Sequence, residues 1–258
     1  LPLVFLAAAA ASAIHAAETR AAARPEFRVL VFSRTLGFRH ASIADGIVAV
    51  SGVGAARGFA TDATEDSTAF TAENLARYRV VILLSVTGDV FNAAQEKAFK
   101  DYVTGGGGFV AVHGALFGPK ACEESWTWLG EAMCATFKNH SKVVPATIVI
   151  EDAKNPSTAA LPARWERSDE WYNYVASPRG CAHVLATLDE STYEGGTHGR
   201  DHPIAWCRRI GRGRFWYTAL GHTPSTFVEP LFRKHLLGGI LLVAGVEAAD
   251  FSPNAAPK

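Results

Sequence analysis

The stretch "GGGGFVAVHGALFG", residues 105–118, joins four glycines to a short apolar run that stops at a histidine. An apolar run bounded by turn residues is typical of a buried strand, so we expect a strand over residues 108–114. In α/β enzymes, a glycine-flanked strand of this kind presents a nucleophile at the tip of the sheet, usually Ser or Cys. His113 takes that position here. It is therefore the first candidate functional residue, with an ordinary strand-end role as the alternative.

Strands and helices alternate on the N-terminal side of this stretch. The sequence predicts strands at residues 27–33, 59–66 and 79–89, and helices at residues 40–58, 71–78 and 92–106. Thr71 is a good cap for the second of these helices, because its hydroxyl can accept a hydrogen bond from the backbone of Asn74. The first and third strands are apolar throughout rather than alternating, which indicates a parallel sheet with helices on both faces.

The C-terminal half is less regular. It predicts strands at residues 142–152, 182–189, 202–210 and 214–221, a hairpin turn at 211–214 and a closing helix at 229–245. We find no repeat and no linker composition. We therefore expect one α/β domain over residues 24–248, with antiparallel additions in its second half, followed by a poorly ordered tail at residues 249–258.

Composition limits the kind of partner. Hydrophobic residues make up 48% of the 258 residues and charged residues 19%, and 25 basic residues balance 25 acidic ones. A chain with no net charge has no electrostatic attraction for nucleic acid or for an anionic membrane surface. We therefore do not expect nucleic acid or a membrane as the partner.

The N-terminal residues indicate export, which bears on how the cysteines are interpreted. Residues 1–23 are an apolar stretch followed by small residues, the pattern of a secretory signal peptide, which predicts a periplasmic or secreted protein with no membrane contact after cleavage. Four cysteines are an even number in such a chain, so one or two disulfides are expected. Cys122 and Cys134 lie close together in a loop-like region and are the favoured pair.

Polar side chains follow several of the predicted strands. Ligands of open parallel sheets bind beyond the carboxyl ends of the strands. The residues found at those ends are Arg39, His40, Thr87, Gly88, His113 and His222. Each histidine alone is more often a hydrogen-bonded structural residue than a catalyst. Their coincidence at one expected edge of the sheet favours a functional site.

Two further stretches supply candidate residues. "SDEWYNYVASPRG", residues 168–180, contains Asp169, Glu170, Trp171 and Tyr172, and "STYEGGTHGRDHPIAW", residues 191–206, contains Tyr193 and His202. Carboxylates beside aromatic rings can bind a sugar, by hydrogen bonds to hydroxyls and by stacking on C–H faces. The first stretch could equally be a solvated acid pair beside a core tryptophan. The second could be an active-site lid or a plain connection.

Long motifs resemble one family. The stretches "VLVFSRTLGFRHASI", "TGDVFNAAQEKAFKDYVTGGGGFVAVHGA", "RSDEWYNY" and "HPIAWCRRIGRGRFWYTALGHT" are similar to those of the ThuA-like family, named for trehalose utilisation, and the likeness covers about residues 27–246. The resemblance implies a flavodoxin-like, class I glutamine amidotransferase-like three-layer sandwich with a mainly parallel central sheet. It also implies a role in carbohydrate catabolism, including 3-keto sugars. No cysteine stands where amidotransferases have their nucleophile, so glutamine hydrolysis is not expected.

The preferred hypothesis is therefore a sugar-active hydrolase, lyase or isomerase that needs no cofactor. His113 and His222 would be general acid and base, with Glu170 or Asp169 as the partner carboxylate. Arg39 and His40 would hold hydroxyls or a developing oxyanion. The remaining residues expected to contact the substrate are Thr87, Gly88, Trp171, Tyr172, Tyr193 and His202.

Two alternatives use the same residues differently. His40, His113 and His222 with a carboxylate suit Zn²⁺, Mn²⁺ or Fe²⁺ by ligand type, although no HExxH motif supports a metal. A carbohydrate-binding module without turnover is the other alternative. Its aromatic platform would consist of Trp126, Trp128, Trp171 and Tyr172.

Overall fold

The computed structural model describes residues 26–115 and 127–256, in which all nine strands belong to one sheet. The predicted signal peptide lies outside the described residues. The strands are β1 (Phe27–Phe32), β2 (Phe59–Thr64), β3 (Val80–Leu84), β4 (Gly108–Val112), β5 (Phe137–Ile150), β6 (Arg164–Tyr174), β7 (His183–Asp189), β8 (Pro203–Ile210) and β9 (Gly213–Thr218). The helices are α2 (Ile43–Arg57), α3 (Ala72–Leu75), α4 (Ala93–Thr104), α6 (Thr127–Met133), α7 (Pro224–Val228) and α8 (Pro230–Ala244).

The sheet has a parallel half and an antiparallel half. Its strand order is β2-β1-β3-β4-β9-β8-β7-β5-β6. Strands β2, β1, β3, β4 and β9 are mutually parallel, and every later pairing is antiparallel. This arrangement confirms the predicted mainly parallel sheet with antiparallel additions.

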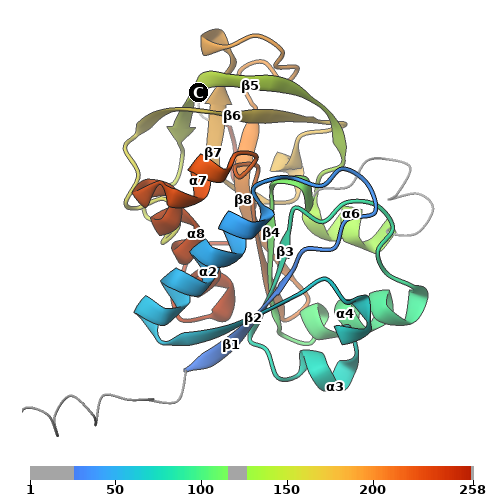
Figure 1. Cartoon of the computed structure of the whole chain (residues 1–258). Helices are drawn as coiled ribbons and strands as arrows, with labels where there is room; N and C mark the ends of the chain where they lie inside the picture. The colour runs from blue at the N-terminus through green and yellow to red at the C-terminus, as the bar shows by residue number, and fades with distance from the viewer. Residues whose placement is uncertain (1–25, 116–126, 257–258) are drawn as a thin grey trace, which may run out of the picture.

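Helices cover both faces of the parallel half. Helices α2, α7 and α8 lie on one face, and α3, α4 and α6 lie on the other (Figure 1). The result is the expected three-layer sandwich. Among the described helices, none is long and apolar enough to cross a membrane.

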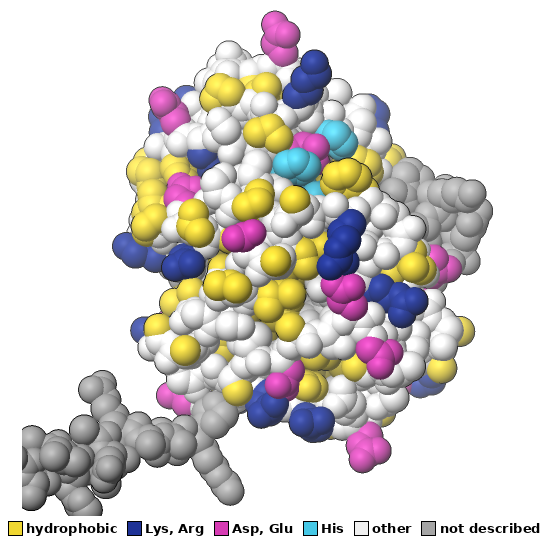
Figure 2. Space-filling view, viewed as in Figure 1, with side chains coloured by type: hydrophobic (Ala, Val, Ile, Leu, Met, Phe, Trp, Pro, Cys, Tyr) yellow, Lys and Arg dark blue, Asp and Glu magenta, His cyan; other side chains and the backbone are white. Residues whose placement is uncertain are grey.

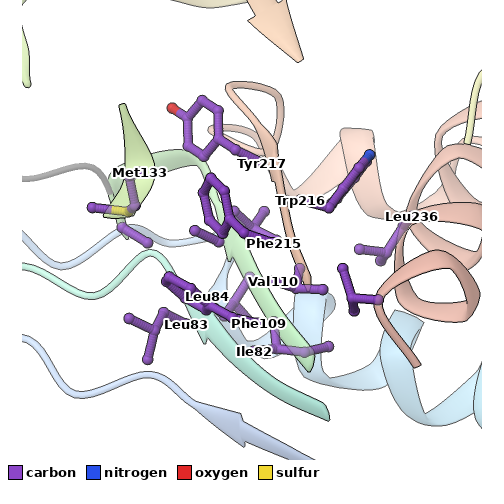
Figure 3. Packing of buried hydrophobic residues seen from close by; sticks show 14 of the residues in the cluster. Ile82, Leu83, Leu84, Phe109, Val110, Met133, Phe215, Trp216, Tyr217 and Leu236 are labelled. Carbon is purple, nitrogen blue, oxygen red and sulfur yellow. The ribbon is translucent and has the colours of Figure 1, made fainter. Parts of the chain in front are cut away.

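The core follows from the alternation of side chains along strands that are buried on both faces. In β9, Trp216 points toward α8 and Leu236, whereas Phe215 points to the opposite face (Figure 3). A Cβ on Gly239 of α8 would lie 2.5 Å from the Trp216 ring, so the glycine lets the helix approach the sheet closely. This packing fixes the carboxyl ends of β4 and β9 relative to each other.

The predicted cap at Thr71 is confirmed, and the structure shows two further helix caps in the N-terminal half. The hydroxyl of Thr71 accepts a hydrogen bond from the backbone of Asn74 at the start of α3. Asn92 and Gln95 form a capping box at the start of α4. Gly58 ends α2 in a left-handed conformation, φ 83°, which a residue without a Cβ adopts freely.

Two strands differ from the expectation. Strand β6 was not predicted, because its sequence "RWERSDEWYNY" contains charged residues in place of an apolar run. Strand β5 begins at Phe137 rather than at residue 142. Figure 1 shows β5 and β6 crossing the upper end of the molecule, above β3 and β4. These two strands therefore bring polar residues to the carboxyl edge of the parallel half.

The favoured cysteine pair was wrong. Cys134 forms a disulfide with Cys181, 47 residues away in the sequence, and Cys122 lies outside the described residues. Cys134 follows α6, whereas Cys181 precedes β7, so the folding of the sheet and not closeness along the chain brings them together. Cys207 is buried and free.

The chain after α8 packs beside β7. The side chain of Asn254 donates to the carbonyl of Val184 at 2.9 Å and accepts from its N–H at 2.8 Å. The ring of His183 bonds to the carbonyl of Ser252 at 2.8 Å. These contacts hold residues 252–254 against the strand, whereas composition alone predicts a poorly ordered tail.

Candidate functional site

His113 sits at the end of β4 in an unusual backbone conformation. It begins a short 3-10 helix (His113–Ala115) with φ 51°, in the left-handed region that costs a non-glycine residue about 1–3 kcal/mol. Ser85, which follows β3, also has a positive φ of 50°. Strain at two neighbouring strand ends persists only where the surrounding structure imposes it, which favours a functional position.

The ring of His113 is fully buried and held from one side. Its Nδ1 donates to the carbonyl of Ala219, 2.7 Å away, and the neutral ring therefore has its lone pair at Nε2. Nε2 lies 3.2 Å from His222 Nδ1 and 3.6 Å from Glu170 Oε2. Strand β4, the loop after β9 and strand β6 thus meet at one point.

Glu170 reaches this point from β6. Its Oε2 lies 3.2 Å from His222 Nδ1, and its Oε1 lies 3.0 Å from His140 Nδ1. The glutamate is only 8% exposed. His140, on the facing strand β5, was not among the candidates of the sequence analysis.

His40 completes the group from the loop between β1 and α2. Its ring packs edge-on against His113 at 4.7 Å and His222 at 5.4 Å between centroids. It is 5% exposed, and its Nδ1 has no hydrogen-bond partner in the described part of the chain. Each of four side chains offers one atom that could ligate a metal ion, and these four atoms all lie within 4.8 Å of one another. We call this group the histidine–glutamate cluster: His40, His113, Glu170 and His222.

Gly114 makes room for His40. A Cβ on this glycine would lie 2.7 Å from Cε1 of the His40 ring, closer than carbon atoms approach each other. The glycine after the strand-end histidine therefore lets a second histidine ring reach the cluster.

Asp169 lies below the cluster rather than in it. It is fully buried and accepts hydrogen bonds from the backbone N–H groups of Gly221 and His222, each at 3.1 Å. It also accepts from the hydroxyl of Thr226 at 3.2 Å. The guanidinium of Arg167, 3.4 Å away, balances its charge. Asp169 thus fixes the loop that carries His222.

The cluster perturbs its own ionisation. Burial lowers the pKa of His40 to about 3, and the neighbouring His113 and His222 add to the effect. Burial alone would raise the pKa of Glu170, but interactions with His113 and His222 lower it to about 2. The hydrogen bond with Glu170 raises the pKa of His222. At neutral pH Glu170 is therefore a carboxylate and His40 a neutral ring.

The cluster is accessible from one side. The side chain of His222 is 23% exposed and that of His140 is 46% exposed, whereas that of His113 is inaccessible. Figure 2 shows histidine and acidic side chains together on the upper part of the visible face, with hydrophobic side chains around them. The ring of Tyr172, 4.5 Å from that of His113 between centroids, closes the buried side.

Two of the predicted substrate contacts shape a loop instead of lining the cluster. The hydroxyl of Thr87 donates to the carbonyl of Phe38, and the carbonyl of Thr87 accepts from Leu36 at 2.7 Å. A Cβ on Gly88 would lie 2.9 Å from Leu36. Arg39 is exposed and pairs with Glu65 at 2.6 Å. The loop is held so that Phe38, 66% exposed, stands beside His40.

The other predicted contacts belong to or lie beside a second group, which contacts β6 through Tyr172. His202 is fully buried, with Nδ1 2.7 Å from Glu190 and Nε2 2.8 Å from the carbonyl of Tyr172. The hydroxyl of Tyr193 contacts the same Nδ1 at 3.1 Å. We call His198, His202, Glu190 and Tyr193 the second histidine group. Trp171 packs near Tyr193, 6.3 Å away between ring centroids.

Trp128, one tryptophan of the binding-module hypothesis, packs away from the cluster. Trp128 packs edge-on against Phe99 at 6.1 Å, on the face covered by α4. Trp126 lies outside the described residues. Of the twelve site residues that the sequence predicted, the structure brings five into contact at one place: His40, His113, Glu170, Tyr172 and His222.

Comparison with known proteins agrees with this architecture. The sequence profile of the ThuA family, described as trehalose utilisation, matches residues 28–243. The chain belongs to the ThuA family. No curated protein matches it.

Solved structures show the same fold. A ThuA-like protein of Bacteroides uniformis is 24% identical, with a TM-score of 0.72 over 85% of this chain and 91% of that one. A ThuA-like protein of Parabacteroides merdae is 18% identical, with a TM-score of 0.69 over 88% and 92%. A Salmonella typhimurium protein described as cytoplasmic is 12% identical, with a TM-score of 0.59 over 84% and 99%.

None of the described cysteines of this ThuA-family chain supplies an amidotransferase-type thiol at the cluster. Among the described cysteines, Cys134 and Cys181 are joined, and Cys207 is buried in β8, where burial raises the pKa of its thiol well above the usual range. The place at the end of β4 is taken by His113. The fold therefore keeps the strand-end position and fills it with an imidazole.

Proposed function

We propose that this protein is an enzyme of carbohydrate catabolism that acts on a sugar or glycoside at the histidine–glutamate cluster. Membership of a family described as trehalose utilisation supports the substrate class. One observation carries the enzyme assignment. Three histidines and a glutamate from four separate segments converge on one buried point that opens to solvent beside His222. A passive sugar platform does not need such a group.

The cluster has the parts for proton transfer to and from a sugar. His113 offers the lone pair of Nε2, and His222 pairs with the carboxylate of Glu170, which favours its protonated form. A base and an acid 3.2 Å apart can serve the same substrate. On a 3-keto sugar, abstraction of the proton next to the carbonyl would lead to isomerisation, or to elimination of the group at C1 followed by addition of water to the double bond, a net hydrolysis. We therefore propose a keto sugar as the first substrate to test.

The test is turnover of a panel of disaccharides and their 3-keto derivatives by the purified chain. Products are followed by NMR and mass spectrometry. We expect conversion of at least one sugar, a loss of at least about 100-fold in Glu170→Gln, and unchanged turnover in His198→Gln. The control residue His198 belongs to the second histidine group, where its Nε2 accepts from the backbone of Tyr174. Binding of sugars without conversion of any member of the panel by the wild-type chain would identify a binding module and end the enzyme proposal.

We also propose that the protein is exported. The support is the apolar stretch at residues 1–23, with small residues at its end. Fractionation of cells that express the chain with its own N-terminal segment, with N-terminal sequencing of the product, tests this. We expect a periplasmic or secreted protein that begins near residue 24. An uncut product in the cytoplasm would contradict export.

A further inference from the structure

We propose that the histidine–glutamate cluster binds one divalent first-row metal ion, of the class of Zn²⁺, Mn²⁺ or Fe²⁺, through His40, His113, Glu170 and His222. The binding of the ion stands on geometry alone. Its use in catalysis rests on the proposed function.

The distances between the donor atoms match a coordination sphere. His113 Nε2, His222 Nδ1 and Glu170 Oε2 are separated by 3.2, 3.2 and 3.6 Å. Ligands about 2.1 Å from an ion lie about 3.0–3.4 Å apart at octahedral or tetrahedral angles. All three separations are near this range at once. Three atoms on different elements thus form one face of a coordination polyhedron.

While the His113 ring is neutral, hydrogen bonds do not account for this arrangement, although a proton on its Nε2 would pair with Glu170. Nδ1 of His113 donates a hydrogen bond to the carbonyl of Ala219. In a neutral ring, Nε2 therefore has a lone pair and no proton. That lone pair faces the carboxylate of Glu170, which is also an acceptor. The single proton of His222 Nδ1 cannot lie toward both neighbours. The cluster therefore gathers more acceptors than donors, and a cation satisfies them together.

His40 gives independent support. The residue is only 5% exposed, and its Nδ1 has no hydrogen-bond partner among the described residues. A buried polar atom left unpaired costs about 1–3 kcal/mol, so it points to a missing partner. The close approach of its ring over Gly114 places this unpaired side chain against the other three ligands.

The surroundings orient the ligands as outer-shell groups do in metal sites. A histidine ligand usually donates its second ring N–H to a carbonyl or carboxylate. His113 donates to Ala219, and the second oxygen of Glu170 lies 3.0 Å from Nδ1 of His140. Asp169 holds the backbone of His222. The ligand atoms are thus preset before any ion arrives.

The donor set selects the kind of ion. Three imidazoles and one carboxylate suit zinc, manganese and iron, whereas magnesium and calcium prefer oxygen ligands. The exposed side of His222 leaves an approach for a substrate oxygen. With the ion bound, His113 and His222 act as ligands. The ion then polarises a carbonyl or hydroxyl oxygen of the sugar in place of direct proton donation.

Metal binding by the whole chain tests the proposal. The protein is stripped with a chelator, its fold is checked by circular dichroism, and it is titrated with Zn²⁺ and with Mn²⁺ by calorimetry. Elemental analysis follows gel filtration. We expect one equivalent of at least one of these ions per chain, binding weaker by about 100-fold or more in Glu170→Gln and in His40→Asn, and unchanged binding in His198→Gln.

The outcomes separate this proposal from the proposed function. Affinity that survives both ligand variants, or no binding of either ion, overturns the metal site. His40→Asn keeps the test sound should Glu170→Gln fail to fold, because the ring nitrogen Nδ1 makes no hydrogen bond that its loss would break. Full sugar turnover after the ion is removed overturns the catalytic use of the metal and leaves the proposed function standing. If the protein binds metal but converts no sugar, the proposed function is overturned and the metal site stands.

Discussion

Two groups of histidines contact β6, and each combines histidine with a glutamate. In the second histidine group, both ring nitrogens of His202 have close partners, Glu190 at 2.7 Å and the carbonyl of Tyr172 at 2.8 Å. Glu190 also accepts from the backbone of His198 and of Gly199, each at 2.8 Å. That group is a clamp that ties the glycine-rich loop to β6.

In the histidine–glutamate cluster the bonding is incomplete. Nδ1 of His40 has no partner within the described ranges, and Nε2 of His113 faces two atoms at once. This difference indicates that residue type alone does not mark a functional site. Unpaired, converging atoms do, because buried polar groups are otherwise almost always satisfied. Variants in one group should therefore change activity, and variants in the other should change stability.

The largest effect is expected from Glu170→Gln. The substitution keeps the size of the side chain and removes its charge, so we expect kcat to fall by about 10²–10⁴-fold. The melting temperature should change by only a few degrees. Steady-state turnover and thermal unfolding measure the two quantities. Full activity with a large loss of stability would place the cluster in the same class as the second histidine group.

The converse change is His202→Ala. It leaves a buried cavity and removes hydrogen bonds to Glu190 and Tyr172, so we expect a loss of about 3 kcal/mol in the free energy of unfolding. Turnover at a temperature where the variant is folded should stay within about threefold of the wild type. Urea unfolding measures the stability. If turnover falls as far as in Glu170→Gln, the two groups are not separable.

The sequence predicted the strand-end histidines because parallel strands end at a common edge. His40, His113 and His222 each follow an apolar strand, and that rule places them together without any knowledge of side chains. The parallel arrangement of the N-terminal strands and the helix cap at Thr71 were predictable for a similar reason, because each depends on local sequence pattern.

The remainder depended on strands that local pattern does not reveal. Strand β6 is polar in sequence, yet residues 169–174 are buried on both faces because they cover the carboxyl edge of other strands. Had β5 been extended to Phe137, pairing with β6 would have placed His140 opposite Tyr172. His202 and Tyr193 looked functional because a glycine-rich loop with polar residues resembles a lid. Only the three-dimensional partners of their atoms show the clamp.

A smaller effect is expected from Gly114→Ala, which tests whether the position of the His40 ring matters for the cluster. In Gly114→Ala the added Cβ would lie 2.7 Å from the His40 ring and push it away from the other three ligands. We expect about a tenfold loss of turnover, or of metal affinity, with about 1 kcal/mol lost in stability. Gly52→Ala, where nothing lies within 4 Å of the new Cβ, is the matched control and should leave turnover and metal affinity unchanged, with stability slightly raised because alanine favours the helix. Equal activity of the two variants would mean that His40 is not needed at its present place.

The smallest effect is expected from a change at Phe38, which lies at the exposed side of the cluster. Phe38 is 66% exposed although its ring lies 4.8 Å from that of His40, and the hydrogen bonds of Thr87 hold its loop in place. An exposed aromatic ring held beside a reaction centre can stack on the C–H face of a sugar, a contact worth about 1 kcal/mol. Phe38→Ala should therefore raise KM about three- to tenfold, with kcat and melting temperature unchanged.

Val48→Ala removes an equally exposed apolar side chain, 64% exposed on α2, and serves as the control. A fall in kcat with no change in KM would show that Phe38 acts through His40, by holding its ring, and not on the substrate. An unchanged KM and kcat would confine recognition of the sugar to the cluster itself. In that case the unpaired atoms that distinguish the cluster from the second histidine group would be the whole of the site on this edge of the sheet.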